Sequence, residues 1–249
     1  MIVLFTDFGL AGPYMGQMHG AILKEFPSAR IVDLFADAPA HDPRRSAYLL
    51  AAYVDEFPAS TTFVCVVDPG VGGSRRALAL EADSRWLVGP DNGLLAMAAR
   101  RARAAAWWHI TWRPERLSAS FHGRDLFAPI AARIAAALPG TGIGPDGLVP
   151  ISANDLVGRD WPDDLGEVIY IDHFGNAMTG LRAGTIPPKA ILVLGGGQPV
   201  VRSRTFCDVP KGEAFWYENA NGLAEIAVNC GRADIALGLS VGSPITVQT

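Results

Sequence analysis

The stretch TTFVCVVDPGVGGSRR, residues 61–76, decides how the chain is expected to fold. Residues 62–67 form an unbroken apolar run rich in β-branched and aromatic types, which is typical of a strand buried on both faces in a parallel sheet. The following Asp68, Pro69 and Gly70 end that strand, because Pro lacks an amide hydrogen and Gly weakens a strand. We therefore expect Asp68 on the loop at the strand's carboxyl end, the edge at which open α/β sheets bind ligands.

The loop that follows is rich in glycine and ends in two arginines. Gly70, Gly72 and Gly73 let the backbone approach a ligand closely, and Arg75 is near enough in sequence to fold back on Asp68. The loop lacks both GxxxxGK[ST] and GxGxxG spacing, and a carboxylate at its start repels phosphate. A cationic or neutral ligand is expected here, with a plain surface turn capped by Asp68 as the alternative.

Composition narrows the classes of protein to consider. With 249 residues, 49% hydrophobic and 18% charged, the chain is expected to form one large or two smaller globular domains. A net charge of -4 without a basic run argues against nucleic acid as the main partner, and no apolar run is long enough for a membrane. Three cysteines without metal-site spacing, and a first stretch that predicts a strand rather than a signal peptide, favour the cytoplasm.

Strands and helices are expected to alternate along the first part of the chain. The expected strands cover residues 2–5, 30–35, 62–67, 77–81, 86–88 and 107–110. The expected helices begin at Pro13, at Pro43 behind a cap at Asp42, after the turn at 90–93, and at Phe121, the last two running to about 104 and 137. This alternation predicts a three-layer α/β domain over residues 1–140.

The texture of the sequence changes after this domain. Residues 141–165 are rich in Gly, Pro and Asp and lack a sustained period, which predicts a linker. From residue 166 short β-rich runs alternate with turns, which predicts a smaller antiparallel β-barrel domain over residues 166–249. The runs are residues 168–171, 190–194, 214–217, 224–228 and 245–247.

Several polar residues stand at the expected loop edges. Asp7 follows the first strand, His122 opens the helix at 121–137, and a polar-aromatic turn covers residues 172–176. Each has a structural alternative: Asp7 as a helix cap, Arg75 as a solvated charge, His122 as a partly buried polar residue, and the turn as a simple hairpin. Their joint placement at strand ends favours a shared site.

Motifs along nearly the whole chain carry a resemblance. TDFG with PYMG, VVDPGVGGSRR, GPDNGLL, FHGRDLFAP, IDHFGN and NANGLAEIAVN occur in this order. Together they resemble the S-adenosyl-L-methionine (SAM) hydroxide adenosyltransferase family, the SAM hydrolases related to fluorinase and chlorinase. The resemblance implies an α/β N-terminal domain, a β-barrel C-terminal domain, and a homotrimer with active sites between the N-terminal domain of one subunit and the C-terminal domain of the next.

The implied reaction is attack of water on the ribose C5′ of SAM, which gives adenosine and methionine without a metal or cofactor. The resemblance assigns catalysis to Asp68, Arg75 and His122, the ribose hydroxyls to Asp7, and the ribose pocket to His41. A sulfonium is already a good leaving group, so the site mainly needs one positioned, partly desolvated water. Asp68 would orient or deprotonate that water, Arg75 would align Asp68, and His122 would hold the water or relay its proton.

The resemblance places the remaining substrate contacts in the second domain. Asn176 would read the adenine edge, Phe174 and Phe206 would flank the purine, and Asp172 would meet the methionine ammonium. The nucleoside pocket would be completed by Glu225 and the backbone near Val228.

Two positions depart from the family pattern. The chain has Gly12 where the family carries Asp before its PY, and Ala220 where the family carries Ser after Asn. Both family residues serve the amino-acid end of SAM, so reading of the methionine tail is expected to differ. Two other functions stay open: a non-catalytic adenosine- or SAM-binding protein, and a metal-dependent nucleotidase with Asp7, Asp68 and His122 as ligands. Product analysis and a chelator distinguish them from a hydrolase.

Overall fold

The structure is a computed structural model that describes residues 1–137 and 147–249. By its internal contacts the chain forms two compact units, Met1–Trp161 and Pro162–Thr249. Of the predicted linker, residues 141–146 lie outside the described residues, and Leu148–Ile151 form a strand of the first unit. The predicted domain boundaries stay a prediction.

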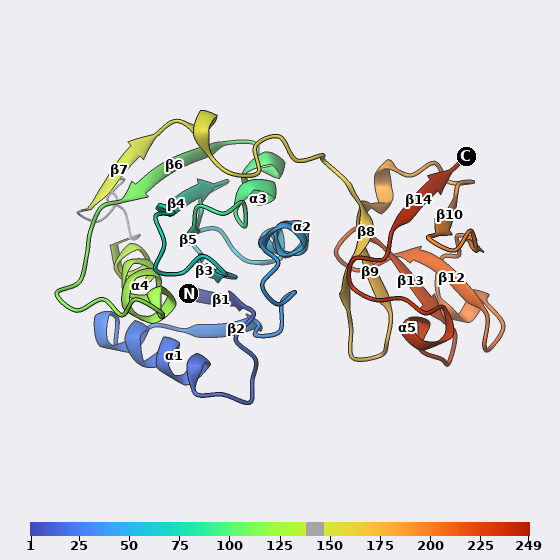
Figure 1. Ribbon diagram of the computed structural model, residues 1–249, viewed down its shortest axis with the longest axis horizontal. Coiled ribbons are helices and arrows are strands. Elements are labelled where there is room, and N and C mark those ends of the chain that lie inside the picture. The colour runs from blue at the N-terminus through green and yellow to red at the C-terminus, as the bar shows by residue number, and fades with distance from the viewer. Residues whose placement is uncertain (138–146) are drawn as a thin grey trace. The chain divides into compact units, whose positions relative to one another are not determined.

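The first unit is built on one mixed sheet of seven strands in the order β2-β1-β3-β5-β4-β6-β7 (Figure 1). Strands β2, β1, β3 and β5 run parallel, whereas β4 is antiparallel to β5 and β6, and β7 is antiparallel to β6. The predicted α/β class is confirmed. The strands are β1 (Ile2–Thr6), β2 (Ile31–Phe35), β3 (Thr62–Val66), β4 (Ala77–Ala82), β5 (Arg85–Pro90), β6 (Ala105–Ile110) and β7 (Leu148–Ile151).

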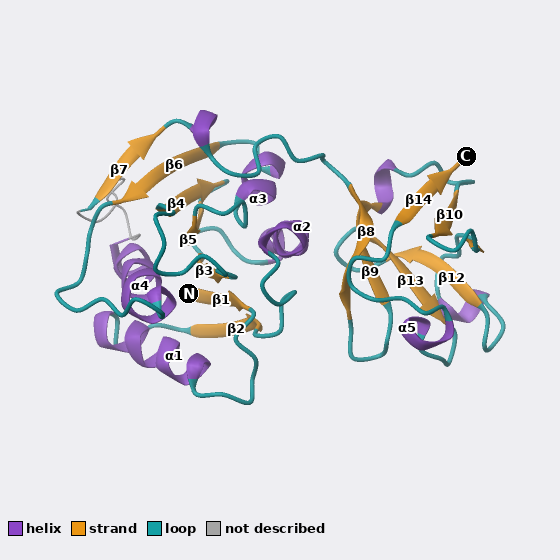
Figure 2. Ribbon diagram, viewed as in Figure 1, coloured by secondary structure: helices purple, strands orange, loops and turns teal. Residues whose placement is uncertain are grey.

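Helices cover both faces of this sheet (Figure 2). They are α1 (Tyr14–Glu25), α2 (Pro43–Tyr53), α3 (Ala96–Arg101) and α4 (Ala128–Ala137), with a π-helical turn η2 (Gly123–Phe127) leading into α4. Helices α1 and α4 lie together on one face. On the other face Phe5 packs on Phe35 at 5.3 Å between ring centroids, and Phe35 packs on Tyr53 of α2 at 5.2 Å. The predicted cap of α2 is confirmed, because the Asp42 carboxylate accepts from the Arg45 amide at 3.0 Å.

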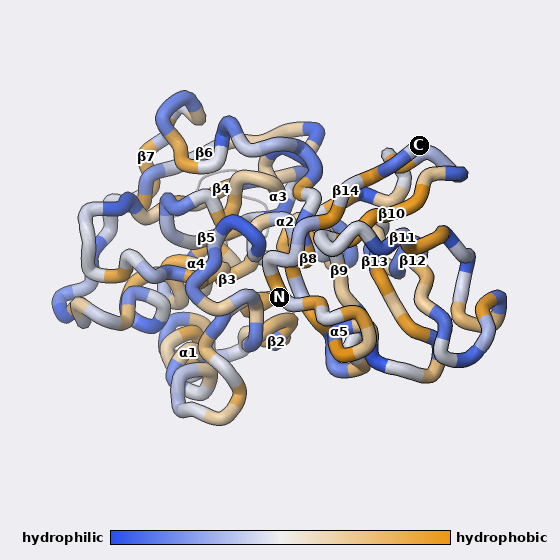
Figure 3. Tube along the Cα trace, turned by 45° about the vertical axis from the view of Figure 1, so that its right-hand side comes forward, coloured by the Kyte–Doolittle hydropathy of each residue, from blue (hydrophilic) through white to orange (hydrophobic). Residues whose placement is uncertain are grey.

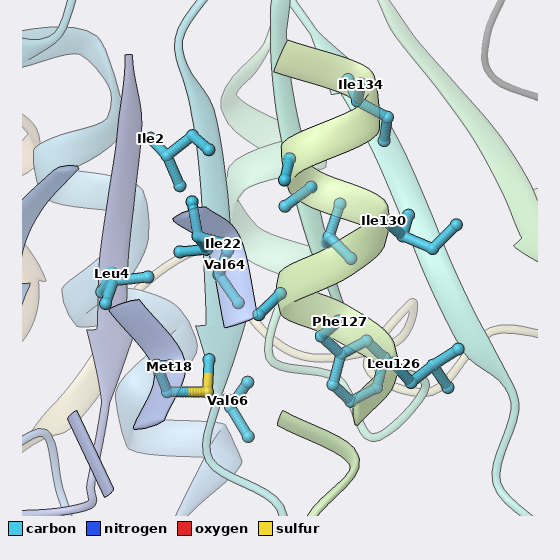
Figure 4. Close-up of a cluster of buried hydrophobic side chains, with 14 of the residues drawn as sticks. Ile2, Leu4, Met18, Ile22, Val64, Val66, Leu126, Phe127, Ile130 and Ile134 are labelled. Atoms are coloured by element: carbon cyan, nitrogen blue, oxygen red, sulfur yellow. The ribbon is translucent and has the colours of Figure 1, made fainter. Parts of the chain in front are cut away.

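The core under α1 and α4 comes from alternate residues of neighbouring strands (Figure 4). Leu4 of β1 pairs in register with Val64 of β3, so both side chains point to the same face. They meet Met18 of α1 and Phe127 at the end of η2, and all four are fully buried. Replacing Phe127 with Ala would cost about 3–5 kcal/mol of folding free energy. This packing fixes the ends of β1 and β3, from which the candidate site is built.

The second unit contains two antiparallel sheets, in the orders β12-β13-β9-β8 and β11-β10-β14. Its centre is β13, which is hydrophobic along most of its length (Figure 3) and buried throughout. Backbone bridges Glu167↔Pro244 and Arg202↔Trp216 link the two sheets. The predicted antiparallel β-structure is confirmed, and its closure into a barrel stays a prediction. The elements are β8 (Leu165–Ile171), β9 (Ala177–Arg182), β10 (Ile191–Leu194), β11 (Pro199–Val200), β12 (Ala214–Glu218), β13 (Leu223–Val228), α5 (Ala233–Ala236) and β14 (Ile245–Gln248).

Short 3₁₀ turns complete the two units: η1 (Val54–Glu56), η3 (Ala153–Asp155), η4 (Ala183–Thr185) and η5 (Phe206–Asp208). Among the helices that the structure describes, none has the length and apolar character required to cross a membrane.

Candidate functional site

The ends of β1 and β3 bring two carboxylates to one cavity. The strands are parallel, with Thr6 in register with Val66, so Asp7 and Asp68 leave the sheet at the same edge. Both line a cavity of about 300 Å³, and His41 and His122 share its wall. The structure thus brings the residues after β1 and β3 together at one cavity, and the shared site stays a prediction.

Asp68 is held by Arg75. The Arg75 Nε donates to Asp68 Oδ1 at 3.0 Å and to Oδ2 at 2.9 Å, and Arg75 Nη2 also donates to Oδ2. Only 4% of the Asp68 side chain and 12% of the Arg75 side chain are exposed. The guanidinium carbon also lies 5.5 Å from the ring centroid of Phe127. Burial and charge-assisted bonds therefore fix the carboxylate in one orientation.

His122 completes this group through the same arginine. Arg75 Nη2 lies 2.9 Å from His122 Nδ1. A guanidinium only donates hydrogen bonds, so Nδ1 must accept, and the ring proton of a neutral His122 stands on Nε2. Burial, followed by the positive charge of Arg75, lowers the pKa of His122 below its ordinary value. The imidazole is therefore neutral near pH 7, with an N–H group free to donate.

Gly72 lets the loop of Asp68 touch the segment before His122. Its φ is +79°, and a Cβ at this position would stand 2.4 Å from the carbonyl oxygen of Ala119. Only glycine fits both the left-handed backbone and this close approach. The glycine that the sequence placed in this loop therefore keeps the Asp68 loop and the His122 segment in contact.

Asp7 is oriented by the backbone of His41. The His41 amide donates to Asp7 Oδ2 at 2.9 Å, and the Asp7 side chain is 9% exposed. The His41 ring is 83% exposed, and its backbone has a φ of 59°. Asp7 therefore keeps a fixed direction while its other oxygen stays available as a hydrogen-bond acceptor.

The cavity also has an aromatic wall that sequence reasoning missed. Phe8, Tyr14 and Phe121 contact one another with ring centroids 5.5–6.0 Å apart. These residues stand inside or beside the motifs TDFG, PYMG and FHGRD, so their place in the motifs was the available clue. The other wall residues not predicted are Val66, Val71, Ser120 and Gly123.

The second unit has its own pocket, of about 680 Å³. The predicted residues among its lining are Asp172, Phe174, Asn176, Phe206 and Val228, and those not predicted are Tyr217, Cys230, Gly231 and Arg232.

Asn176 is preset by Asp172. Its backbone amide donates to Asp172 Oδ1 at 2.8 Å and its side-chain Nδ2 donates to Asp172 Oδ2 at 3.1 Å. Between them Gly175 has a φ of +84°, and a Cβ there would stand 2.5 Å from Asp234 Oδ1. Residues 172–176 therefore form a hairpin turn, one of the two interpretations of this segment. The turn also fixes the side-chain amide of the buried Asn176 in the pocket wall.

Glu225 stands behind this pocket rather than in its wall. It is 3% exposed, and its carboxylate accepts from the hydroxyl of Tyr217 at 2.5 Å and from Asn219 Nδ2 at 2.8 Å. Burial raises the pKa of Glu225, against the lowering effect of both bonds. Tyr217 connects it to the pocket because the two residues are cross-strand partners on β12 and β13. That register was not visible in the sequence, so Tyr217 was missed.

The predicted residues thus fall into two groups, one in each unit. Asp7, His41, Asp68 and His122 line the first cavity with Arg75 behind Asp68. The other predicted residues line the second pocket, except Glu225, which stands behind Tyr217. Within residues 1–137 and 147–249, no cluster of three or more His, Cys, Asp or Glu side chains is arranged to hold a metal ion.

Comparison with known proteins covers almost the entire chain. The SAM hydroxide adenosyltransferase N-terminal domain model matches residues 2–144, and the C-terminal domain model matches residues 166–246. An (R)-S-adenosyl-L-methionine hydrolase from Salinispora arenicola is 40% identical over 97% of this chain and 95% of its own. A protein of the same name from Thermus thermophilus is 40% identical over 98% of both chains.

A solved structure has the same fold. The crystal structure of an uncharacterized conserved protein from Thermotoga maritima matches this chain with a TM-score of 0.86 and 30% identity, over 100% of both chains.

Proposed function

Because the chain belongs to the SAM hydroxide adenosyltransferase family, we propose that it is an enzyme that hydrolyses S-adenosyl-L-methionine to adenosine and L-methionine. The observation that carries the proposal is the buried contact of Asp68, Arg75 and His122 at a cavity shared with Asp7. The names of the relatives further support the R epimer at sulfur as the substrate.

The reaction makes modest chemical demands. The water oxygen bonds to the ribose C5′, the C5′–S bond breaks, and its electron pair stays on sulfur as the neutral thioether of methionine. The water loses one proton, and no acid is required because the leaving sulfur carries a positive charge. What the site must supply is a water held in line with C5′ and an acceptor for its proton.

Asp68 and His122 are suited to opposite sides of that water. Asp68 is the acceptor, since both of its oxygens are fixed by Arg75 and still have free lone pairs. His122 donates from Nε2, because its Nδ1 is occupied by Arg75. The proton of the water therefore passes to Asp68, and His122 acts as the donor that orients the water's oxygen.

The rest of the substrate is divided between the two pockets. In the first unit, the free oxygen of Asp7 accepts from the ribose hydroxyls and His41 borders the ribose. In the second unit, Asn176 reads the adenine edge, Asp172 meets the ammonium, and Phe174 flanks the purine. The same pocket is completed by Phe206, Val228 and, through Tyr217, Glu225.

We also infer that the second unit closes as a barrel. The supporting contacts join its two sheets at both edges. Val168 exchanges backbone bonds with Gly242 and Ser243 at 2.8 and 2.9 Å, and Trp216 exchanges bonds with Val201 and Ser203 at 2.9 Å. A closed barrel leaves no unpaired strand edge, so we expect amide hydrogen exchange to be slow at both seams.

The enzyme would work as a homotrimer in which the first unit of one protomer and the second unit of the next form each site. Two observations support this: the residues for the ribose and the reacting carbon lie in one unit and those for the adenine and the ammonium in the other, and Phe174 is 71% exposed for a residue meant to flank a purine. Light scattering should then report a trimer, and a fully active monomer would contradict it.

Mixed trimers give the sharper test of assembly. Asp68→Asn impairs only first units and Asn176→Ala only second units. In equal mixture, about a quarter of the shared sites would combine two intact halves, and each variant alone would have none. Refolding or subunit exchange followed by assay at low SAM should recover about that fraction of activity. No recovery would contradict sites shared between protomers.

The function itself is tested by incubation with SAM and chromatography of the products. Adenosine and methionine should appear in equal amounts, faster from the R epimer than from the S epimer, and unchanged by a chelator. Bound but intact SAM would indicate a non-catalytic binding protein. Loss of turnover with the chelator would indicate the metal-dependent alternative.

A further inference from the structure

The catalytic loop straddles strand β5. The sheet order is β3-β5-β4, so the chain leaves β3 on one side of β5 and enters β4 on the other side. Because β3 and β5 are parallel and β4 is antiparallel to β5, both ends of the loop pass the carboxyl end of β5. The two residues directly after β5 are Asp91 and Asn92, which belong to the GPDNGLL motif and have no role in the proposed reaction.

Asn92 holds the outgoing end of the loop. Its Nδ2 donates to the carbonyl oxygen of Val67 at 2.8 Å, and its Oδ1 accepts from the Leu94 amide at 3.2 Å. Val67 is fully buried and immediately precedes Asp68. The Asn92 amide therefore fixes the peptide from which the Asp68 side chain departs.

Asp91 holds the returning end. Its carboxylate accepts from Arg76 Nε at 2.7 Å and from the Val157 amide at 3.2 Å, and its own amide donates to the Arg76 carbonyl at 3.0 Å. Arg76 immediately follows Arg75. The carboxylate is nearly buried, with 7% of the side chain exposed, whereas the Arg76 side chain is 36% exposed.

We propose that Asp91 and Asn92 form a clamp, called here the β5 clamp, that positions Asp68 and Arg75 for catalysis. The Asp68–Arg75 pair is internal to the loop, so it cannot by itself set the loop's orientation toward Asp7 and His122, which other segments carry. Three glycines make the loop flexible, so ties at both ends are needed in addition to the contacts of Arg75 with His122 and of Gly72 with Ala119. This inference rests on the proposed hydrolase function.

Asn92 offers a test that separates positioning from capping. Asn92→Ala removes both of its bonds, whereas Asn92→Asp keeps the acceptor for the Leu94 amide and sets an oxygen against the Val67 carbonyl. Both should lower kcat by about 10–100-fold, since a displacement of about 1 Å at a reacting group costs on that order, with KM changed less than about threefold. Wild-type kcat in Asn92→Asp would leave Asn92 only a capping role and overturn the proposal.

Asp91 tests the other end of the loop. Asp91→Ala should lower kcat as Asn92→Ala does, and Asp91→Asn, which keeps an oxygen acceptor, should recover part of the loss. Asp83→Ala is the matched control. At the β4–β5 turn, the opposite edge of the sheet, Asp83 accepts from the Arg103 and Ala104 amides at 3.0 Å. This control should lower Tm and leave kcat unchanged. Equal kcat losses in Asp83→Ala and the clamp variants would overturn the proposal.

A readout that does not depend on turnover is the NMR titration of the His122 imidazole. Burial, Arg75 and Arg113 lower its pKa, and Asp68 and Asp125 raise it. Loosening the loop should move the pKa upward in the clamp variants and leave it unchanged in Asp83→Ala. If the wild type releases no adenosine, the proposed function fails, while this titration still tests the clamp. An unchanged pKa of His122 in both Asn92→Ala and Asp91→Ala would overturn the clamp proposal.

Discussion

The cavity of the first unit and the pocket of the second differ in how strongly their side chains are preorganised. In the first, the side chain of Asp68 is 4% exposed and is held by Arg75, which also holds His122. In the second, the cavity is about 680 Å³ instead of about 300 Å³, and Phe174 is 71% exposed. The first region is a small cavity whose polar groups are fixed by buried hydrogen bonds, and the second is a larger pocket with an exposed aromatic ring.

This difference suggests a division of labour between chemistry and recognition. Groups that must hold a water within a fraction of an ångström are locked by buried hydrogen bonds, because rate depends steeply on their placement. Groups that bind a purine gain most from ring contact, which tolerates adjustment. Changes in the first unit should therefore lower kcat, and changes in the second should raise KM.

The largest expected effect comes from Asp68→Asn. The amide keeps the shape of the side chain but cannot take a proton, so kcat should fall by about a hundredfold or more while adenosine still binds. Stopped assays of kcat with calorimetry of adenosine binding measure both. Arg75→Ala should also be slow. Retention of more than about a tenth of wild-type activity by Asp68→Asn, a loss below about 1.4 kcal/mol, would refute its catalytic role.

In the second unit, Asn176→Ala should act mainly on KM. Removing a preset amide, which we propose reads the adenine edge, should raise KM by about 10–100-fold, with kcat changed only a few-fold. Asn229→Ala is a suitable control, because Asn229 Nδ2 donates to the Val209 carbonyl at 2.6 Å and Asn229 is absent from the pocket lining. A fall in kcat with KM unchanged would break the division between the two regions.

Reading of the methionine tail should be weaker than the family pattern implies. Positions 12 and 220 lack the Asp and Ser of the family pattern, so two polar contacts of about 1.5–3 kcal/mol each are missing. Their loss should lower selectivity for the methionine tail at least about tenfold. Decarboxylated SAM should therefore be a tolerable substrate. Gly12→Asp with Ala220→Ser should lower KM for SAM about tenfold; the new Cβ at Gly12 meets only the half-exposed ring of Tyr14, at 3.2 Å.

The ratio of kcat/KM for SAM and its decarboxylated analogue decides this. A preference for SAM above about a thousandfold, roughly 4 kcal/mol, would mean that Tyr14, Asn221 or another group has taken over the tail.

The smallest expected effect is a displaced pH profile. The active His122 is neutral, and burial and Arg75 lower its pKa below the ordinary 6.5. Activity should therefore persist as pH falls through 6.5 and decline only below it, where protonation removes the Nδ1 acceptor. Stability follows the same sign: the unfolded chain takes up the proton first, so the free energy of unfolding falls as pH drops below 6.5. A kcat/KM inflection above 6.5 assigned to His122 would contradict this.

Apolar runs and helix-capping residues in the sequence predicted the strands and helices that contain them. The apolar run before Asp68 is β3, and Asp42 with Pro43 begins α2. The helix expected to reach residue 104 ends at Arg101 instead, because the Asp83 carboxylate binds the amides of Arg103 and Ala104. Here a contact from the β4–β5 turn outweighs helix propensity.

Three strands lacked a local pattern: β7, β9 and the two-residue β11. In β7, Pro150 interrupts the run of apolar residues, and a proline is tolerated because β7 is an edge strand. Its strand conformation comes from pairing with β6. In β9, Gly180 weakens the strand pattern, yet a Cβ there would stand 2.6 Å from that of Leu165. Close packing against β8 therefore requires the glycine. The same limit applies to the site: motifs located Asp68 and Asn176, but cross-strand register was needed to place Tyr217 beside Glu225.

The central claim is that the first unit directs water to C5′ of the substrate, and isotopic water tests it most directly. Purified protein should be incubated with SAM in ¹⁸O-labelled water, and the products resolved by mass spectrometry. The label should appear in the 5′ oxygen of adenosine and not in methionine. In Asp68→Asn the rate at which labelled adenosine forms should be about a hundredfold or more lower. Formation of methylthioadenosine with labelled homoserine would contradict it. So would labelled adenosine formed by Asp68→Asn at the wild-type rate.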